Sequence, residues 1–352
     1  VRRMTTSDPY DYSLTRPGEL IAAVPAMLGF VPEKSLVLVT IEHGCLGCAM
    51  RADLSDDVLG IAIQMAEVAA ASRPERAVLV IVDEAGASCR MCNDEYRELS
   101  AAVTEALNER GIELWAAHVV DRIAAGGRWH CADGCGNSGT VDDPSSSPMA
   151  AAAVLEGRPL YARRDELLEF VTVTEPERAA GLSTLIERAT HAGGDRPAAA
   201  ARRDVEHAMD AATTIADGGL LADDDVARLA CALTDPRVRD TMYALAVGSA
   251  GHEAEALWAL MVRVLPDPSR VEALVLLAFS AYSRGDGPLA GISLGEALRA
   301  NPEHRMARML DQALQTGMRP QQIRELARTG YRLAKRIGVR LPPPRPFGRR
   351  AS

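Results

Sequence analysis

The chain has 352 residues, of which 47% are hydrophobic and only 4% aromatic, and its formal net charge is −9. This length exceeds a typical single core, so two domains are expected. The charge is unevenly distributed, because residues 319–352 contain ten basic side chains and one acidic side chain, Glu325, which leaves −18 on residues 1–318. An acidic body of this kind argues against a nucleic-acid enzyme with a large basic cleft.

Export and membrane signals are not evident in the sequence. No uninterrupted apolar segment reaches the roughly 18 residues that a membrane helix needs. The best early candidate, residues 20–31, contains Pro25 and lacks the small-residue cleavage pattern of a signal peptide. We therefore expect a cytoplasmic protein, in which paired cysteines more often bind metal or carry out redox chemistry than form structural disulfides.

An α/β domain is predicted over residues 16–148, after a polar and flexible lead-in at residues 1–15. Apolar segments rich in branched residues predict strands over 35–41, 76–82 and 112–120. The order of strands and helices indicates a largely parallel sheet covered by helices, with these three strands mutually parallel. Further elements are expected as helices over 17–28, 55–71 and 93–110, as a strand over 49–54, and as a loop over 132–148.

Residues 149–337 are predicted to form an all-α domain. A shift of 34 positions aligns Ala256 with Ala290 and Leu260 with Leu294. This period, with a Pro at each helix boundary, resembles the tetratricopeptide pattern. One hypothesis is therefore a groove that holds a partner protein, and the alternative is a set of packed helical hairpins without a ligand.

The C-terminal residues 338–352 are rich in Pro and Arg and are predicted to form a disordered basic tail. Just before them, Arg324, Arg328, Arg332 and Arg336 recur at helical spacing and share one helix face. The functional hypothesis is a weak electrostatic contact with nucleic acid, anionic lipid or an acidic partner. The alternative is a solvated helix end that offsets the acidic body.

Six of the seven cysteines occur as close pairs. These pairs are Cys45/Cys48, Cys89/Cys92 and Cys131/Cys135. Two C-x-x-C motifs indicate Zn²⁺, whose tetrahedral sites favour thiolates. Because each pair follows a predicted strand, and parallel strands end at the same edge of a sheet, all three pairs are expected at the carboxyl edge. We therefore predict a zinc site formed by the first two pairs, with Cys131 and Cys135 beside it as alternative ligands.

Other interpretations of this edge remain open. His43, His118 and His130 lie near it and could replace a thiolate as ligands. A redox dithiol is a second interpretation, because a C-x-x-C motif at a helix N-terminus has a lowered thiol pKa. Cys92 directly precedes the helix expected over 93–110 and is thus the best thiolate candidate. A third interpretation is a set of loop thiols that share no metal.

Motifs that would identify an enzyme are weak. The chain has no Walker A loop, no G-x-G-x-x-G after a strand, no H-E-x-x-H and no G-x-S-x-G. Asp83 and Asp121 end predicted strands at the same edge, and with His118 they would line the pocket of an enzyme. More often such carboxylates cap the next segment. The sequence therefore favours a non-enzymatic interaction or regulatory protein, with an enzyme that has its pocket at the carboxyl edge as the alternative.

Three segments carry a resemblance to a known family. Residues 16–37 read RPGELIAAVPAMLGFVPEKSLV, which resembles the opening signature of an actinobacterial family, domain of unknown function 4192. Residues 127–140 are similar to its middle motif and residues 285–317 to its closing signature. The family shows Cys-Cys-Pro in the middle motif, where this chain has Gly-Asn after Cys135. The resemblance covers most of the chain and implies no catalytic residue.

Overall fold

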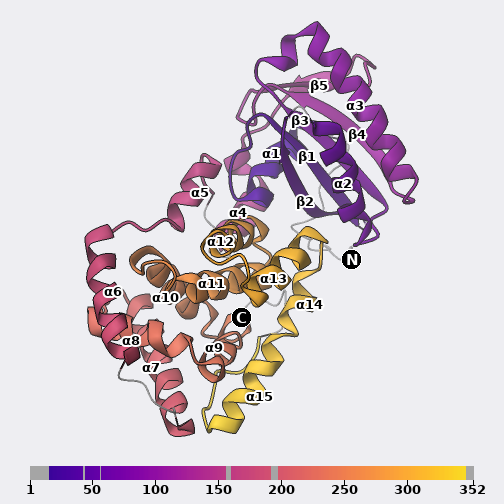
Figure 1. The fold of residues 1–352 in the computed structure, drawn as a ribbon. Coiled ribbons are helices and arrows are strands. Elements are labelled where there is room, and N and C mark those ends of the chain that lie inside the picture. The colour runs from indigo at the N-terminus through magenta and orange to yellow at the C-terminus, as the bar shows by residue number, and fades with distance from the viewer. Residues whose placement is uncertain (1–15, 43, 56, 156–159, 192–196, 346–352) are drawn as a thin grey trace, which may run out of the picture. The chain divides into compact units, whose positions relative to one another are not determined.

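The computed structural model describes residues 16–345, apart from residues 43, 56, 156–159 and 192–196. The chain divides into two compact units, the first ending at Glu166 and the second beginning at Leu167. The first unit holds the strands and the second holds only helices among its regular elements (Figure 1).

The first unit contains one mixed sheet of six strands in the order β2-β1-β3-β4-β5-β6. In chain order the strands are β1 (Ser35–Glu42), β2 (Cys45–Asp53), β3 (Arg76–Val82), β4 (Glu113–Val120), β5 (Arg128–Cys131) and β6 (Ser138–Thr140). The described α-helices that lie in this unit are α1 (Pro17–Leu28), α2 (Val58–Ala70), α3 (Arg90–Asn108) and α4 (Pro148–Leu155). The three strands predicted from the sequence therefore lie in one sheet.

The strand directions differ from the predicted parallel arrangement. β3 and β4 are parallel, but β1 is antiparallel to β3, with Val39 paired to Val78. The reason is the β1–β2 hairpin, because the chain enters α2 from β2 and not from β1. The β2–α2–β3 crossover aligns β2 with β3 and leaves β1 between them in the opposite direction. The prediction that all three strands are mutually parallel is thus wrong for β1.

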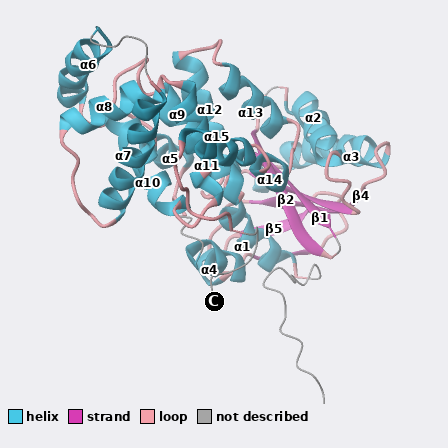
Figure 2. Cartoon of the chain, turned by 90° about the horizontal axis from the view of Figure 1, so that it is seen from below, coloured by secondary structure: helices cyan, strands magenta, loops and turns pink. Residues whose placement is uncertain are grey.

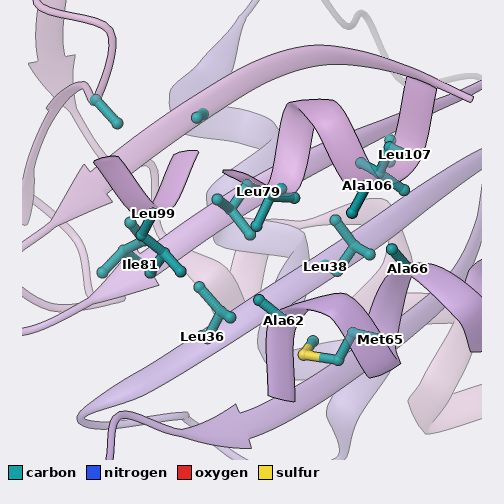
Figure 3. Close-up of a cluster of buried hydrophobic side chains, with 14 of the residues drawn as sticks. Leu36, Leu38, Ala62, Met65, Ala66, Leu79, Ile81, Leu99, Ala106 and Leu107 are labelled. Carbon is teal, nitrogen blue, oxygen red and sulfur yellow. The ribbon is translucent and has the colours of Figure 1, made fainter. Parts of the chain in front are cut away.

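One face of this sheet packs against α2 and α3. In Figure 3, Leu36 and Leu38 of β1 and Leu79 and Ile81 of β3 point toward these two helices. The helices contribute Ala62, Met65, Ala66, Leu99, Ala106 and Leu107 to the same buried cluster. Each large aliphatic side chain buried here contributes about 1.5–3 kcal/mol. This cluster therefore fixes the position of α3, whose first turn carries two cysteines.

The other face of the sheet is also covered. Val37 and Val39 of β1, and Val78 and Val80 of β3, alternate with the cluster residues and are fully buried. Figure 2 shows α2 and α3 on one side of the sheet and α1 and α4 on the other. Burial on both faces explains why the sequences of these strands are uninterrupted apolar segments and do not alternate between apolar and polar residues.

β5 and β6 extend the sheet beyond β4 and were not predicted. Both strands are short, and β6 lies inside the segment expected to be a loop. The indole N–H of Trp129 donates a hydrogen bond to the carbonyl oxygen of Thr140 at 3.2 Å. A Cβ at Gly139 would lie 3.0 Å from the same indole ring. A glycine is therefore needed where the two strands meet under Trp129.

The second unit is helical, as predicted for this part of the chain. Its elements are α6 (Pro176–His191), α7 (Ala198–Ala216), α8 (Asp223–Leu233), α9 (Pro236–Met242), α10 (Gly251–Val264), α11 (Val271–Arg284), α12 (Gly287–Ala300), α13 (Arg305–Gln315), α14 (Pro320–Arg324) and α15 (Ala327–Ile337). α5 (Arg164–Phe170) contains the division between the two units. α11 lies at the centre of this unit (Figure 1), with 12 of its 14 residues buried.

The tetratricopeptide-like character is not confirmed. Ala256 and Leu260 of α10 are only half-buried, whereas their 34-residue matches Ala290 and Leu294 are fully buried. The two 34-residue matches thus differ in burial, which gives no support to a repeat at these positions. In addition, the nearly complete burial of α11 leaves this helix no open face with which to line a groove.

Part of the segment expected to be a disordered tail, residues 338–345, is among the described residues. Residues 338–345 lie against the second unit, where the Tyr331 hydroxyl donates a hydrogen bond to the Pro342 carbonyl at 2.9 Å. The backbone N–H of Arg345 donates to the Val247 carbonyl at 2.8 Å. The rest of the predicted tail lies outside the described residues. No helix in the described part of the chain is long and apolar enough to cross a membrane.

Candidate metal centre

The direction of β1 separates the first two cysteine pairs. The backbone N–H of Cys48 donates a hydrogen bond to Thr40 Oγ1 at 2.8 Å, and Thr40 pairs with Ala77 near the start of β3. Cys89 follows the other end of β3, which is roughly 20 Å long at about 3.3 Å per residue. Two Zn–S bonds span at most about 4.6 Å. The structure therefore does not bring Cys48 together with Cys89 and Cys92.

The predicted zinc site of Cys45, Cys48, Cys89 and Cys92 loses its geometric basis. Cys45 pairs through its backbone with Glu42 in the same hairpin as Cys48, and its side chain is outside the described part. His43, a proposed substitute ligand, also lies outside the described residues. The two C-x-x-C motifs lie apart because β1 runs antiparallel to β3. This direction places the β1–β2 hairpin at the edge of the sheet opposite the carboxyl ends of β3 and β4.

A different group of ligand atoms converges after β5. Cys131 Sγ, a carboxylate oxygen of Asp133 and Cys135 Sγ all lie within 4.8 Å of one another. Asp133 Oδ1 accepts a hydrogen bond from the backbone N–H of Cys135 at 2.9 Å, which closes the turn. Gly134 and Gly136 have φ of 75° and 87°, a left-handed conformation that glycine adopts without strain. The turn thus brings both thiols back to the same side.

His118 of β4 lies beside this group. Its Nδ1 is 3.9 Å from Cys131 Sγ, and the two residues are paired across the β4–β5 ladder, so their side chains share a face of the sheet. Trp129 packs edge-on against the imidazole, with ring centroids 5.0 Å apart. Burial lowers the pKa of His118 to about 4, partly opposed by the charge of Asp133. The imidazole is therefore neutral at physiological pH, which is the form that binds metals.

The Cys131 thiol of this group is protonated when no cation is bound. Burial raises the pKa of Cys131 to about 12, and its hydrogen bond with Cys135 raises the pKa as well. The backbone N–H of Cys135 lowers the pKa of the Asp133 carboxyl, which is thus a carboxylate. A divalent cation inverts this balance, because it stabilises thiolates directly.

Two sulfurs, one oxygen and one nitrogen match the donor preferences of Zn²⁺ and not those of Mg²⁺ or Ca²⁺. Bonds of about 2.0–2.3 Å to a tetrahedral ion place its ligand atoms roughly 3.3–3.8 Å apart. The ligand atoms of Cys131, Asp133 and Cys135 lie within 4.8 Å of one another, and His118 Nδ1 lies 3.9 Å from Cys131 Sγ, so the ligands would have to move closer together around an ion. Asp133 was not predicted as a ligand, although an acidic residue between two closely spaced cysteines in a turn can be recognised in the sequence as a possible metal ligand.

The remaining pair, Cys89 and Cys92, lies at the start of α3. Cys92 packs against the core cluster beneath α2 and α3, whereas Cys131 shares the other face with His118. Cys89 is the N-cap residue, and its sulfur accepts a hydrogen bond from the backbone N–H of Cys92 at 3.5 Å. The two cysteine pairs therefore belong to different places in the fold.

The geometry at the start of α3 favours Cys89 as the thiolate, whereas the sequence pattern predicted Cys92. The hydrogen bond from the Cys92 backbone lowers the pKa of the Cys89 thiol. The hydrogen bond between the two thiols raises the pKa of Cys92, and burial raises it as well. The cause is the position of the helix start, because α3 begins at Arg90 rather than at residue 93.

Asp83 and Asp121, offered as pocket residues of an enzyme, have structural partners. Asp83 accepts a hydrogen bond from the Tyr96 hydroxyl at 2.5 Å. Asp121 Oδ1 accepts hydrogen bonds from the backbone N–H groups of Arg122 and Arg128 at 2.6 and 2.8 Å. Both carboxylates close the segments that follow their strands. This geometry gives no support to acid–base catalysis by these residues.

The structure thus defines a protein with a cysteine-bearing α/β unit followed by a helical unit. The family model described as "Domain of unknown function (DUF4192)" matches residues 17–321. The chain belongs to this family. Comparison with curated proteins and with solved structures gives no match.

Proposed function

We propose that this protein is a regulatory protein whose α/β unit binds Zn²⁺ through Cys131, Asp133, Cys135 and His118. The observation that supports it is the convergence of the first three ligand atoms within 4.8 Å, with His118 Nδ1 3.9 Å from one of them. Two thiolates, a carboxylate and an imidazole complete a tetrahedral set.

The placement of the ligands indicates what the ion would do. His118 is anchored in β4, inside the sheet, whereas Asp133 and Cys135 lie in the exposed turn between β5 and β6. A bound ion would tie the turn to the sheet and stabilise its short edge strands. Because the turn is exposed, the ion can enter from solvent, and its occupancy would change the shape of an accessible surface.

The proposed regulatory surface would contact a partner protein. Because α11 is nearly fully buried, a partner contact would use the outer faces of other helices or the β5–β6 turn. A second candidate function, an enzyme with its pocket at the carboxyl edge, has no supporting observation, because Asp83 and Asp121 are engaged in closing turns.

Metal analysis of the reduced protein tests the proposal. Full-length protein is loaded with Zn²⁺, passed through gel filtration and analysed for zinc per chain. The expected result is one ion per chain, lost in Cys131→Ser and Cys135→Ser and retained in the matched controls Cys48→Ser and Cys89→Ser. Chelator competition should show at least about tenfold weaker binding for Asp133→Asn and His118→Leu.

Two results would contradict the proposal. The first is a wild-type protein that binds no zinc after loading under reducing conditions. The second is zinc that survives the Cys131→Ser and Cys135→Ser substitutions and is lost with Cys89→Ser, which would place the ion at the start of α3 instead.

A further inference from the structure

We propose that Cys89 and Cys92 form a redox-active dithiol that reduces disulfides, with Cys89 as the nucleophile and Cys92 as the resolving thiol. This activity lies beyond the zinc site, because it uses other cysteines on the opposite face of the sheet. It rests on the geometry of the first turn of α3.

The two sulfurs are placed for a disulfide. Cys89 is the N-cap and Cys92 stands three residues later in a helix of 19 residues. Cα atoms three residues apart at the start of a helix lie about 5 Å from each other, which is within the roughly 4.4–6.8 Å that disulfides span. The Cα separation therefore permits a Cys89–Cys92 bond within one turn.

The environments of the two thiols give them different roles. The Cys92 backbone N–H donates to Cys89 Sγ at 3.5 Å, and this contact at the positive end of the helix stabilises a thiolate on Cys89. Cys92 packs against the buried cluster, and the negative charges of Glu95 and Asp83 add to the effects that keep its thiol protonated. An accessible thiolate beside a protonated neighbour is the arrangement that thiol–disulfide exchange requires.

A side-chain amide holds the loop that carries Cys89. Asn93 Nδ2 donates hydrogen bonds to the carbonyl oxygens of Ala87 and Cys89, at 3.2 and 2.9 Å. These bonds fix the backbone on both sides of the N-cap. Next to the pair, Met91 is 70% exposed and offers an apolar contact for a peptide or protein that carries a disulfide.

The reaction balances as a two-electron exchange. The Cys89 thiolate attacks one sulfur of the substrate disulfide, so a mixed disulfide forms, the substrate S–S bond breaks, and the leaving thiolate takes a proton. Cys92 then loses its proton and attacks Cys89 Sγ, which forms the Cys89–Cys92 disulfide and releases the second substrate thiol. The substrate is reduced, and a second dithiol is the reductant that returns the pair to its reduced state.

Reaction with oxidised glutathione tests this inference in the full-length protein. The reduced protein is mixed with the disulfide, quenched by acid and examined by intact mass and peptide mapping. Wild type should form the Cys89–Cys92 disulfide and release two glutathione thiols. Cys92→Ser should retain one glutathione on Cys89. Cys89→Ser, which keeps a good N-cap residue, should react at Cys92 at least about tenfold more slowly.

Controls separate this activity from the zinc site. Cys48→Ser and the double substitution Cys131→Ser/Cys135→Ser should behave like wild type in the glutathione reaction. Glutathione that stays on Cys89 in wild type without resolution would overturn the proposal. A faster reaction at Cys92 than at Cys89, or at Cys131 than at either, would also overturn it.

Discussion

His130 Nε2 lies 2.7 Å from Asn93 Oδ1, and this contact joins β5 to the first turn of α3. The Asn93 amide nitrogen already donates to two carbonyl groups, so its oxygen faces His130 and the imidazole N–H is the donor. One side chain thus connects the segment that carries Cys89 with the strand that carries Cys131. It supports both proposed sites without belonging to either.

Replacing Asn93 should therefore destabilise the first unit. Asn93→Ala removes three side-chain hydrogen bonds, to the Ala87 and Cys89 carbonyls and to the His130 imidazole, at a cost of about 1–3 kcal/mol. The Cys89 carbonyl keeps the hydrogen bond from the backbone N–H of residue 93. The neighbouring Asp94 forms only an exposed ion pair with Arg97, so Asp94→Ala should cost less than about 1 kcal/mol. Urea unfolding followed by tryptophan fluorescence compares the two. Equal unfolding midpoints would show that the Asn93 contacts contribute nothing.

Two glycines of the second unit provide a matched pair. A Cβ at Gly330 would lie 2.9 Å from the Cβ of Ala244 and from the carbonyl oxygen of Asp240, so Gly330→Ala should force α15 away from α9 and cost about 1–3 kcal/mol. At Gly295 in α12 nothing lies within 4 Å, so Gly295→Ala should stabilise the helix by about 0.5–1 kcal/mol. Thermal unfolding followed by circular dichroism measures both. A shift of the same sign in the two variants would contradict the packing of α15.

A buried guanidinium holds the start of α11. Arg270, only 3% exposed, donates to Asp267 at 2.8 Å, to Glu296 at 3.1 Å and to the Val171 carbonyl at 3.1 Å. Because the Val171 carbonyl would lose this donor, Arg270→Met should reduce the free energy of unfolding by about 1–3 kcal/mol. Arg299 is largely exposed, and Arg299→Met should cost less than about 1 kcal/mol. Urea titrations of the two variants measure the change in the free energy of unfolding for each, and the ratio of these two changes is the test.

The thiol of Cys89 should react with an unusual pH dependence. Its pKa is lowered by hydrogen bonds from Cys92, so the folded protein holds more thiolate than the unfolded chain at every pH below the ordinary value of 9.0. Alkylation of Cys89 by iodoacetamide should thus reach its half-maximal rate at a lower pH in the folded protein than in urea. Coinciding profiles would show that the helix N-terminus does not activate this sulfur.

Much of the fold could be predicted from the sequence. The buried strands are long, apolar and rich in branched residues, and the helices of the second unit have clear boundaries at Pro and Gly, so both kinds of element were recognisable. The direction of each strand relative to its neighbours could not be predicted, because the residue pattern of an apolar strand such as β1 is the same for parallel and antiparallel pairing. The hairpin between β1 and β2 decides the direction, and only its connection to α2 reveals it.

The candidate site depended on that direction. Two C-x-x-C motifs have the spacing of zinc ligands, but spacing along the chain does not say which edge of the sheet each motif reaches. β5 is too short and too polar to be recognised, and its pairing with β4 is what brings Cys131 to His118. The start of α3 at Arg90 reversed the roles of Cys89 and Cys92. In each case, either a long-range strand pairing or a shift of a few residues in a helix boundary determined which side chains come together and which thiol is activated.

Zinc X-ray absorption on the loaded, reduced protein identifies the ligand atoms of the bound ion. We expect a first shell of two sulfurs at about 2.3 Å and two nitrogen or oxygen atoms at about 2.0–2.2 Å. In Cys135→Ser the sulfur contribution should fall to one atom or the ion should be lost, while Cys89→Ser should give the wild-type spectrum. A shell of four sulfurs, or one without sulfur, would contradict a site built from Cys131, Asp133, Cys135 and His118.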